Sequence, residues 1–256
     1  MILTIVKIGG NVIDNPEELA NFLKNFVALP SPKILVHGGG KIASELSKTM
    51  GIEPQFVNGR RITDAATLDI AVMVYGGLLN KKIVASLQSL GCNAVGLSGA
   101  DAGVVRSGKR PSEPVDFGFV GDVREVANTM LHSLLELSLT PVFCALTHDG
   151  QGQLLNTNAD TMASEIAIAL GALYEVHLYY CFEKQGVLQD VNDENSLITH
   201  IDSERYQSLL DQKIIADGML PKLENCFRSL QKGVAQVHIG NPQMITTNVK
   251  HTTISL

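Results

Sequence analysis

Lysine and glycine residues that follow short apolar runs are the parts of this sequence best suited to chemistry. Lys7 lies near the end of one apolar run, just before Gly9 and Gly10, and a second run leads into residues 37–40, His-Gly-Gly-Gly. Glycine lets the backbone approach a ligand closely and turns several N–H groups toward an anion. A lysine beside such a turn adds positive charge, so the pattern favours phosphate binding. Two tight turns without any function are the alternative, because either turn taken singly is weakly specific.

Two further polar segments are typical of helix starts but contain more than a helix start requires. Residues 156–160, Asn-Thr-Asn-Ala-Asp, precede an apolar stretch, and capping needs only one polar side chain. Residues 217–222, Asp-Gly-Met-Leu-Pro-Lys, indicate a turn followed by a helix. Lys222 then lies in the first helical turn, where the helix dipole disfavours a cation unless an anion binds nearby. We interpret Lys81 and Lys82, in contrast, as a solvated face.

Several familiar phosphate and metal motifs are excluded. Residues 103–109 have the glycine and lysine spacing of a P-loop, but Arg110 replaces the required Ser or Thr and Pro111 forbids the helix that must follow. No G-x-G-x-x-G follows the first apolar run, and the protein kinase signatures are missing. The seven histidines and four cysteines show no spacing of metal ligands, so we expect no metal site built by the protein.

The composition narrows the class of protein. The 256 residues are 45% hydrophobic and 18% charged, which suits one large domain or two lobes. A net charge of -6 argues against nucleic acid or an anionic membrane as the main partner. The first residues do not resemble a signal peptide, and no apolar stretch approaches the length of a membrane span. The four scattered cysteines predict reduced, mostly buried thiols, and therefore a cytoplasmic protein.

Short β-rich runs alternate with helical segments, which predicts an α/β fold with a mainly parallel central sheet. In chain order we expect strand 3–8, a helix starting at 14–18, strand 33–36, helix 42–50, a hairpin at 56–62, helix 65–90, strand 93–97, loops and small hairpins over 99–123, helix 128–137, strand 141–146, helix 158–170, strand 176–182, helices 203–212 and 219–231, and strands 236–239 and 252–256. Both glycine turns then lie at carboxyl ends of strands, where open α/β sheets bind ligands. A boundary between two lobes is expected near Gly171.

At these motifs the sequence closely resembles the N-acetylglutamate kinases of the amino acid kinase family. The matching motifs are KIGGN at 7–11, VHGGG at 36–40, VNGRRIT at 57–63, GLSGADAG at 96–103, GFVGDV at 118–123, NTNAD at 156–160 and DGMLPK at 217–222. One such motif is weak evidence, but seven in the same order cover essentially the whole chain. The resemblance implies an open αβα sandwich with two lobes. Residues 1–171 would bind the acyl amino acid and form a dimer, and residues 172–256 would bind ATP.

The resemblance also implies which residues act on each substrate. The expected catalytic residues are Lys7 and Lys222, which would neutralise the transferring phosphoryl group, and Asp160, which would hold both lysines. The expected acyl-glutamate ligands are Gly39, Gly40, Arg61 and Asn156. The residues expected to bind ATP and its phosphates are Gly9, Gly10, Gly39, Glu183, Gly186, Ile214, Ile215 and Ala216. At 182–186 the chain has Phe-Glu-Lys-Gln-Gly where the family commonly has D-V-x-G, and we interpret Glu183 as the replacement for the aspartate.

The implied reaction is phosphorylation of the γ-carboxylate of N-acetyl-L-glutamate by ATP, which gives an acyl phosphate for arginine (ornithine) biosynthesis. A carboxylate with an ordinary pKa of about 4.3 is already ionised at neutral pH, so no general base is required. The difficulty is to bring two anions together, and cations, N–H donors and positioning serve this purpose. Mg²⁺ is expected to arrive with ATP, bound mostly by phosphates and water. We expect closure of the two lobes to be the only way to bring both lysines onto one phosphoryl group.

Other functions stay open at this point. The same reaction could use N-succinyl-L-glutamate or another N-acyl amino acid. A non-catalytic, ligand-binding regulator on the same fold should have lost a lysine, yet Lys7 and Lys222 are both present. A nicotinamide oxidoreductase is a remote third reading.

The expected assembly is a homodimer that arginine does not inhibit. Arginine-sensitive relatives carry an additional N-terminal helix, whereas the first strand here begins at the second or third residue. The long helix at 65–90 is a plausible dimer surface, with Met73, Val74 and Leu78 available to pack.

Overall fold

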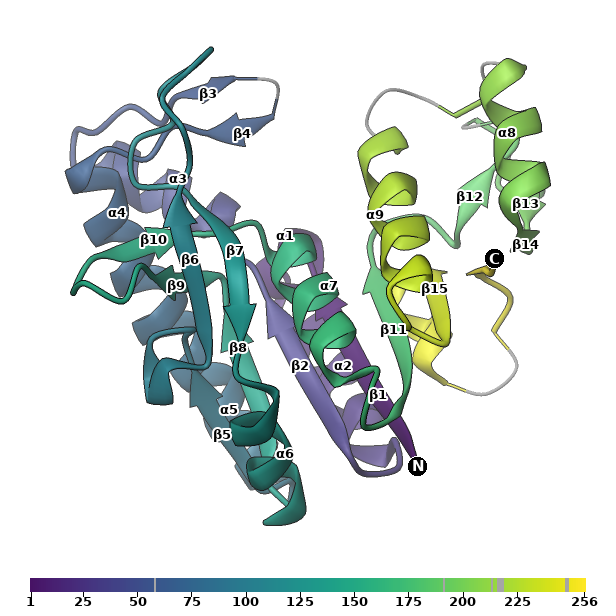
Figure 1. The fold of residues 1–256 in the computed structure, drawn as a ribbon, viewed down its shortest axis with the longest axis horizontal. Helices are drawn as coiled ribbons and strands as arrows, with labels where there is room; N and C mark the ends of the chain where they lie inside the picture. The colour runs from purple at the N-terminus through teal and green to yellow at the C-terminus, as the bar shows by residue number, and fades with distance from the viewer. Residues whose placement is uncertain (58, 191, 213, 216–218, 247–248) are drawn as a thin grey trace. The chain divides into compact units, whose positions relative to one another are not determined.

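The chain folds into two compact units. A computed structural model describes residues 1–57, 59–190, 192–212, 214–215, 219–246 and 249–256, and Figure 1 traces their helices and strands. One unit, which we call the discontinuous unit, combines Met1–Ile34 with Ala163–Leu256. The other, which we call the inserted unit, comprises Leu35–Met162.

Five strands of the central sheet belong to the discontinuous unit. Their order is β14 (His200–Ile201), β16 (Thr252–Ile254), β15 (Gln236–Gly240), β11 (Glu175–Cys181) and β1 (Ile2–Ile8). Neighbouring strands are parallel except for β15 and β16. Because β1 pairs with β11, the start of the chain belongs to the same unit as its second half. A separate antiparallel pair joins β12 (Val187–Leu188) to β13 (Leu197–Ile198).

The helices described in the discontinuous unit are α1 (Gly10–Asp14), α2 (Pro16–Ala28), α8 (Ser203–Asp211), α9 (Leu220–Gln231) and the short 3₁₀ turn η3 (Pro242–Ile245). The helix start predicted at 14–18 is confirmed. The side chain of Asn15 accepts hydrogen bonds from the N–H groups of Glu17 and Glu18 at 3.0 and 3.3 Å, and Pro16 takes the first helical position. α9 packs against β15 (Figure 1).

Three parallel strands of the central sheet run through the inserted unit. Their order is β2 (Lys33–His37, in this unit from Leu35 onward), β8 (Thr140–Cys144) and β5 (Ala94–Leu97). All residues of β2 and β8 are buried, as expected of parallel strands covered on both faces. α5 (Asn80–Ser89) and α6 (Asn128–Glu136) pack on β8.

A second sheet of the inserted unit has the order β10 (Leu154–Asn156), β9 (Leu146–His148), β6 (Val105–Lys109) and β7 (Gly121–Val126). The sequence predicted only loops and small hairpins over 99–123, because glycine, proline and charge dominate there. Further elements of this unit are α3 (Gly40–Thr49), η2 (Asp101–Gly103), the first turn of α7 (Ala159–Leu170, which lies mostly in the discontinuous unit) and the hairpin of β3 (Phe56–Val57) and β4 (Arg60–Arg61). That hairpin was predicted, although Asn58 of its turn lies outside the described residues.

The helix predicted over 65–90 is present but changes its winding. α4 (Ala65–Ala71) and α5 are α-helical, whereas η1 (Val72–Leu79) between them is π-helical. The predicted cap is confirmed, because the Asp64 carboxylate accepts from the Thr67 N–H at 2.8 Å. Gly91, with φ of 78°, follows the end of α5. A π-helical segment is rare and often marks a functional site.

The same helix bears on the question of a membrane. By length and composition, Ala65–Ser89 is apolar enough to cross one, and 44% of its most apolar window is buried. The expectation that no apolar stretch approaches the length of a span is therefore wrong. Core helices of water-soluble proteins pass the same test, so the segment is weak evidence for a membrane protein.

The fold class is confirmed as α/β with a large, mainly parallel central sheet. The four cysteines are free and buried, as predicted. The expected lobe boundary near Gly171 does not coincide with the limits of the compact units, because residues 1–34 join the second half through β1 and β11. Which substrate each lobe binds stays a prediction.

Candidate active site

The first glycine turn joins β1 to α1 and is next to Lys7. Gly9 has extended backbone, with φ of -99° and ψ of -178°, and no side chain among the described residues caps α1. A Cβ added to Gly9 would lie 3.5 Å from Lys7 Nζ and 3.8 Å from the Cys181 carbonyl oxygen. The Lys7 ammonium therefore lies beside Gly9 at the carboxyl ends of β1 and β11. Burial raises the pKa of the Cys181 thiol to about 12, although the Lys7 charge acts in the opposite direction.

Lys222 reaches the same strand end from another element. It lies in the first turn of α9, as predicted, and its Nζ is 5.2 Å from the centre of the Phe182 ring. Phe182 directly follows Cys181, so the two lysines approach consecutive residues at the end of β11. Both lysines belong to the discontinuous unit. Whether closure of the two lobes brings both cations onto one phosphoryl group stays a prediction.

The residues expected to bind the nucleotide lie beyond β11. Glu183 is exposed, whereas Gly186 is buried at the start of β12. A Cβ added to Gly186 would come within 2.5 Å of Thr252 Oγ1. That hydroxyl accepts from the Val187 N–H at 2.8 Å and donates to the Ile198 carbonyl at 2.6 Å. Packing alone therefore requires glycine at position 186, whatever binds nearby.

Three further residues that follow α8 were expected to bind the nucleotide. Ile214 and Ile215 are half-buried, and the Ile214 N–H donates to the Leu209 carbonyl at 3.1 Å. Ala216 lies outside the described residues, as do Asp217 and Gly218 of the DGMLPK motif.

The second glycine turn joins β2 to α3 and is tightly covered. Gly39 has φ of 155°, which L side chains rarely adopt. A Cβ added there would lie 2.4 Å from Leu79 Cδ1 and 2.9 Å from Tyr75 Cδ1. Leu79 and Tyr75 both come from η1, so the π-helical segment packs directly on the turn. No other residue fits position 39 without displacing this segment.

Arg61 is held against the second turn. Its Nη2 donates to the Gly40 carbonyl at 2.7 Å and to Ser44 Oγ at 2.6 Å. The guanidinium carbon is 4.7 Å from the centre of the Phe56 ring. Its Nη1 is buried without a hydrogen-bond partner among the described residues. A buried donor left unpaired is unfavourable, so Nη1 would gain from an acceptor supplied by a ligand.

Tyr75 lies beside the same guanidinium. Burial raises the pKa of its phenol, and the positive charge of Arg61 partly opposes this shift. The phenol is therefore neutral at physiological pH and is suited to hydrogen bonding rather than to acid–base chemistry.

Asn156 joins this region through Thr63. Its Nδ2 donates to Thr63 Oγ1 at 3.0 Å, and its backbone N–H donates to the Phe119 carbonyl at 2.9 Å. The Phe119 N–H in turn donates to the Thr63 carbonyl at 2.7 Å. Gly118, with φ of 70°, lies so close that an added Cβ would be 2.2 Å from the Thr63 oxygen. The GFVGDV motif thus connects the strand of Arg61 to Asn156.

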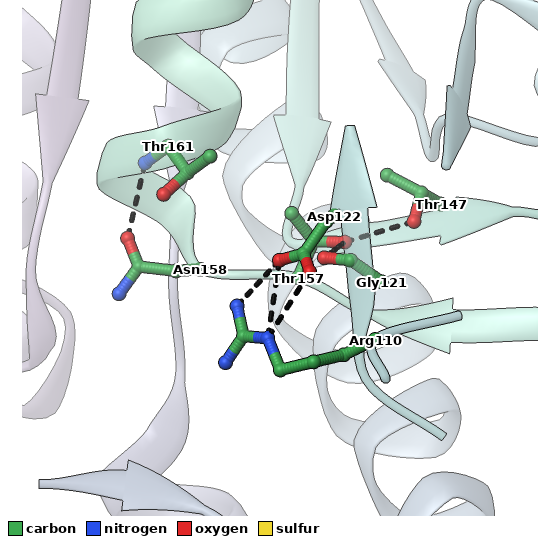
Figure 2. A network of polar contacts seen from close by, with 7 residues as sticks. All are labelled: Arg110, Gly121, Asp122, Thr147, Thr157, Asn158 and Thr161. Carbon is green, nitrogen blue, oxygen red and sulfur yellow. Dashed lines mark hydrogen bonds and ion pairs between the residues drawn. The ribbon is translucent and has the colours of Figure 1, made fainter. Parts of the chain in front are cut away.

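Figure 2 shows how the rest of the 156–160 segment is held. Asn158 Oδ1 accepts from the Thr161 N–H at 3.0 Å, so Asn158 is the residue of the segment that caps α7. Thr157 Oγ1 lies 2.8 Å from Thr147 Oγ1 and 3.3 Å from the Gly121 carbonyl. These two anchors leave Asn156 as the residue of the segment turned toward Thr63.

An ion pair supports the same network. Arg110 contacts Asp122 through Nε at 3.1 Å and through Nη2 at 2.5 Å (Figure 2). Asp122 follows Gly121, whose small size is required because an added Cβ would lie 2.9 Å from Leu155, Ser107 and Thr147.

The predicted residues therefore fall into two groups. Lys7, Gly9, Gly10 and Lys222 lie in the discontinuous unit, and Gly39, Gly40, Arg61 and Asn156 lie in the inserted unit. Asp160, in the first turn of α7, belongs to the inserted unit, so its expected role with the lysines stays a prediction.

Sequence reasoning missed Ser44, Thr63, Tyr75 and Asn80. Of these, only Ser44 gave a signal, because it lies one helical turn beyond Gly40. The interpretation of Lys81 as solvated was incomplete, because its Nζ donates to Asn80 Oδ1 at 3.1 Å. Over the described ranges, no three His, Cys, Asp or Glu side chains are placed to hold a metal ion.

Comparison with known proteins decides the family. The model of the amino acid kinase family matches residues 3–241 of this chain. The chain belongs to the amino acid kinase family. This amino acid kinase is 56% identical over 238 residues to the acetylglutamate kinase of Cytophaga hutchinsonii, covering 93% of this chain and 90% of that protein. It is 50% identical over 246 residues to the acetylglutamate kinase of Bacteroides fragilis, covering 96% and 94%.

A solved structure confirms the fold of this amino acid kinase. N-acetylglutamate synthase from Neisseria gonorrhoeae, complexed with coenzyme A and N-acetyl-glutamate, superposes with a TM-score of 0.83. The match covers 99% of this chain and 59% of that one at 20% sequence identity, and so shows the fold alone.

Proposed function

We propose that this amino acid kinase is an acetylglutamate kinase, which transfers the γ-phosphoryl group of ATP to the γ-carboxylate of N-acetyl-L-glutamate in arginine biosynthesis. The observation that carries the proposal is Arg61, held on the second glycine turn with a buried Nη1 that has no partner among the described residues. Its 56% identity to an acetylglutamate kinase over 93% of the chain supports the same reaction.

The acyl-glutamate would bind to the inserted unit. Arg61 would donate to its α-carboxylate through Nη1, while the Gly40 carbonyl and Ser44 keep the guanidinium in place through Nη2. Asn156, oriented by Thr63, would hold the acyl amide. Because these contacts exist in the free protein, little ordering remains to be done when the substrate binds.

Phosphoryl transfer would depend on the two lysines. Lys7 and Lys222 would neutralise the phosphoryl group as charge moves between two anions, and backbone N–H groups of Gly10 and Gly39 would bind its oxygens. Asp160 would orient the lysines. The nucleophile is an ionised carboxylate, so the reaction requires no general base.

ATP would lie at the end of β11, next to both lysines. Glu183, Gly186, Ile214, Ile215 and Ala216 would line its site. ATP use implies a divalent ion, and we propose Mg²⁺. The described residues offer no cluster of carboxylates for it, which fits an ion held mostly by phosphate oxygens and water.

A product assay tests this function. Purified protein with MgATP is given N-acetyl-L-glutamate, N-succinyl-L-glutamate or free glutamate, and hydroxylamine traps any acyl phosphate. We expect a trapped product with N-acetyl-L-glutamate and none with free glutamate, which lacks the acyl amide. Faster reaction with N-succinyl-L-glutamate would change the acyl group but keep the chemistry. A lack of product with every N-acyl amino acid would contradict the proposal.

The proposal includes a homodimer in the cytoplasm. Met73 and Leu78 on η1 are 47% and 44% exposed and are available to pack against a second copy. Val74, which the sequence placed on the same surface, is 1% exposed and belongs to the core. Free, buried cysteines and the use of ATP agree with a cytoplasmic location. Size exclusion with light scattering should give twice the chain mass, and any other mass would contradict the dimer.

A further inference from the structure

A buried chain of polar groups lies behind the second glycine turn. His37, the last residue of β2, is 0% exposed, and Asn80, the first residue of α5, is 1% exposed. Asn80 Nδ2 lies 3.1 Å from His37 Nε2 and 2.9 Å from the Val142 carbonyl oxygen. Lys81 Nζ donates to Asn80 Oδ1 at 3.1 Å. At the other end, His37 Nδ1 lies 2.8 Å from the carbonyl oxygen of Gly38.

The outer partners determine where every proton lies. A lysine ammonium only donates, so the amide atom of Asn80 that faces Lys81 is its oxygen. The Val142 carbonyl only accepts, so the amide NH₂ faces Val142 and His37. His37 Nε2 must then accept, and the single imidazole proton lies on Nδ1, where it donates to the Gly38 carbonyl.

The electrostatics of His37 agree with a neutral ring. Burial lowers the pKa of His37 to about 4, the bond to Gly38 raises it in part, and the charge of Lys81 lowers it further. Among the described residues that act on this ring, Lys81 of α5 is the charged one, and Asn80, Gly38 and Val142 are neutral.

Two features of the fold make room for this chain of groups. A Cβ added to Gly96 would lie 2.0 Å from Asn80 Oδ1 and 2.9 Å from Lys81 Nζ, so the glycine of the GLSGADAG motif admits both side chains. Asn80 also directly follows η1, whose residues Tyr75 and Leu79 cover Gly39. Residues of η1 therefore pack on Gly39 of the turn. Asn80, which follows η1, contacts His37 at the end of β2, just before the turn.

We propose that His37 and Asn80 are positioning residues of the second glycine turn. Asn80 holds His37 in its Nδ1–H form, and His37 fixes the Gly38 carbonyl and thereby the direction of the Gly39 and Gly40 N–H groups. The inference rests on the proposed kinase function, since those N–H groups would face the phosphoryl group and the acyl-glutamate. Neither His37 nor Asn80 touches a substrate, and their effect passes through the backbone of the turn.

Two substitutions of His37 separate positioning from packing. An asparagine amide can occupy the place of Nδ1 and donate to the Gly38 carbonyl, whereas a glutamine amide occupies the place of Nε2 and cannot. We expect His37→Gln to lower kcat roughly 10- to 100-fold, because small displacements of positioned groups are costly in rate. His37→Asn should retain most of kcat, and KM for ATP should change little in both. Equal losses in the two variants, in parallel with their stability, would indicate packing alone and overturn the proposal.

Lys81 and its neighbour Lys82 provide a matched pair of variants that tests the contact between Lys81 and Asn80. Lys81→Met removes the donor that orients the Asn80 amide and should lower kcat about fivefold, the equivalent of one ordinary hydrogen bond. Lys82→Met changes the next, exposed side chain in the same way and should leave kcat unchanged.

Nuclear magnetic resonance of the full chain tests the pair without any activity. The imidazole nitrogen shifts of His37 at neutral pH should place the proton on Nδ1 in the wild type. The amide shifts of Gly39 and Gly40 should move in His37→Gln and not in Lys82→Met. If no acyl-glutamate is phosphorylated, the kinase function fails while these spectra still decide the positioning role. A proton on Nε2, or unmoved glycine amides in His37→Gln, would overturn it.

Discussion

The two glycine turns lie in different units, and their glycines are required for different reasons. In the first turn, the atoms nearest to a Cβ added to Gly9 are Lys7 Nζ at 3.5 Å and the Cys181 oxygen at 3.8 Å, which are ordinary contacts. In the second turn, a Cβ added to Gly39 would lie 2.4 Å from Leu79, and the backbone has φ of 155°. The fold tolerates a methyl group at the first site and not at the second.

This difference separates a glycine that packing does not require from a glycine that the fold requires. The neighbours of Gly9 leave room for a methyl group, so we propose that its small size serves a ligand in front of Lys7. Gly39 is enclosed by η1, so its substitution changes the protein before any substrate arrives. Activity and stability should therefore change independently in the first turn and together in the second.

The largest effect on activity is expected from the lysines at the first turn. Lys7→Met and Lys222→Met should each lower kcat by roughly 10²–10³. KM should change less, because the cations act most strongly on the partly transferred phosphoryl group. The double variant should be less than additive if the pair acts as a unit. Steady-state kinetics at saturating substrates measures these effects, with Lys24→Met on the exposed side of α2 as the control. A normal kcat in either folded variant would remove the mechanism.

Gly39→Ala should damage the second turn as a whole. The strained backbone and the contact with Leu79 should lower the free energy of unfolding by about 3 kcal/mol or more. Urea denaturation measures this loss, and kcat should fall in parallel. Gly77→Ala is the control in the same π-helical segment, because in the part of the chain that the structure describes no atom outside the helix backbone lies within 4 Å of its added Cβ. Equal free energies of unfolding for the two variants would show that η1 can shift away from the new methyl group at position 39 without loss of stability.

Arg61→Lys should affect binding at the second turn more than turnover. A lysine cannot keep Nη2 on Gly40 and offer a second nitrogen to a carboxylate, so KM for the acyl-glutamate should rise roughly tenfold or more. Arg60→Lys alters the exposed neighbour on the same strand and should leave KM unchanged. An unchanged KM in Arg61→Lys would mean that the guanidinium holds only the turn.

Gly9→Ala is the sharpest test of the comparison. Because its backbone suits any residue, the free energy of unfolding should change by less than about 1 kcal/mol. Activity should nevertheless fall about tenfold, because the new methyl group lies in front of the Lys7 ammonium. If activity and stability both stay at wild-type values, the first turn is an ordinary connection.

The smallest expected effect is the pH dependence of stability that comes from one buried histidine in each unit, His37 and His238. Burial lowers the pKa of His37 to about 4 and, with the charges of His251 and His177, that of His238 to about 3. A histidine with a native pKa below its ordinary value of 6.5 takes up its proton mainly when unfolded, so its stabilisation is complete above pH 6.5 and is lost as pH falls. Each group should contribute up to about 1.4 kcal/mol per pH unit.

Urea unfolding between about pH 7 and pH 5 measures this slope. His238→Gln should reduce the slope by about one proton, and a variant of an exposed histidine such as His200→Gln should not. Equal slopes in the wild type and His238→Gln would contradict the assignment.

Local features of the fold were predictable, and features that depend on distant residues were not. The caps at Asn15 and Asp64 and the place of Lys222 in a first helical turn follow from short stretches of sequence. The pairing of β1 with β11 leaves no local pattern, so it could not be predicted from the sequence. The π-helical winding of η1 was missed too, because its apolar residues fit an ordinary α-helix equally well.

The candidate site shows the same division. Residue types and the family motifs led to Arg61 and Lys7. Ser44, which holds Arg61, could not be predicted because it comes from a separate segment. The same is true of the side-chain contacts that link Lys81, Asn80 and His37. Lys81 is exposed, as its interpretation as part of a solvated face predicted, but its contact with Asn80 depends on Gly96 and leaves no signal in the sequence.

The discontinuous unit has a consequence for synthesis on the ribosome. β1 ends at Ile8, and its partner β11 begins only at Glu175. At roughly 5–20 residues per second, the first strand emerges on the order of ten seconds before the strand that covers its edge. The whole of Leu35–Met162 leaves the ribosome in that interval and can fold first. A nascent strand with one uncovered apolar edge is a target for chaperones and for misassembly, so slow translation should prolong the exposure of the edge of β1 that β11 later covers.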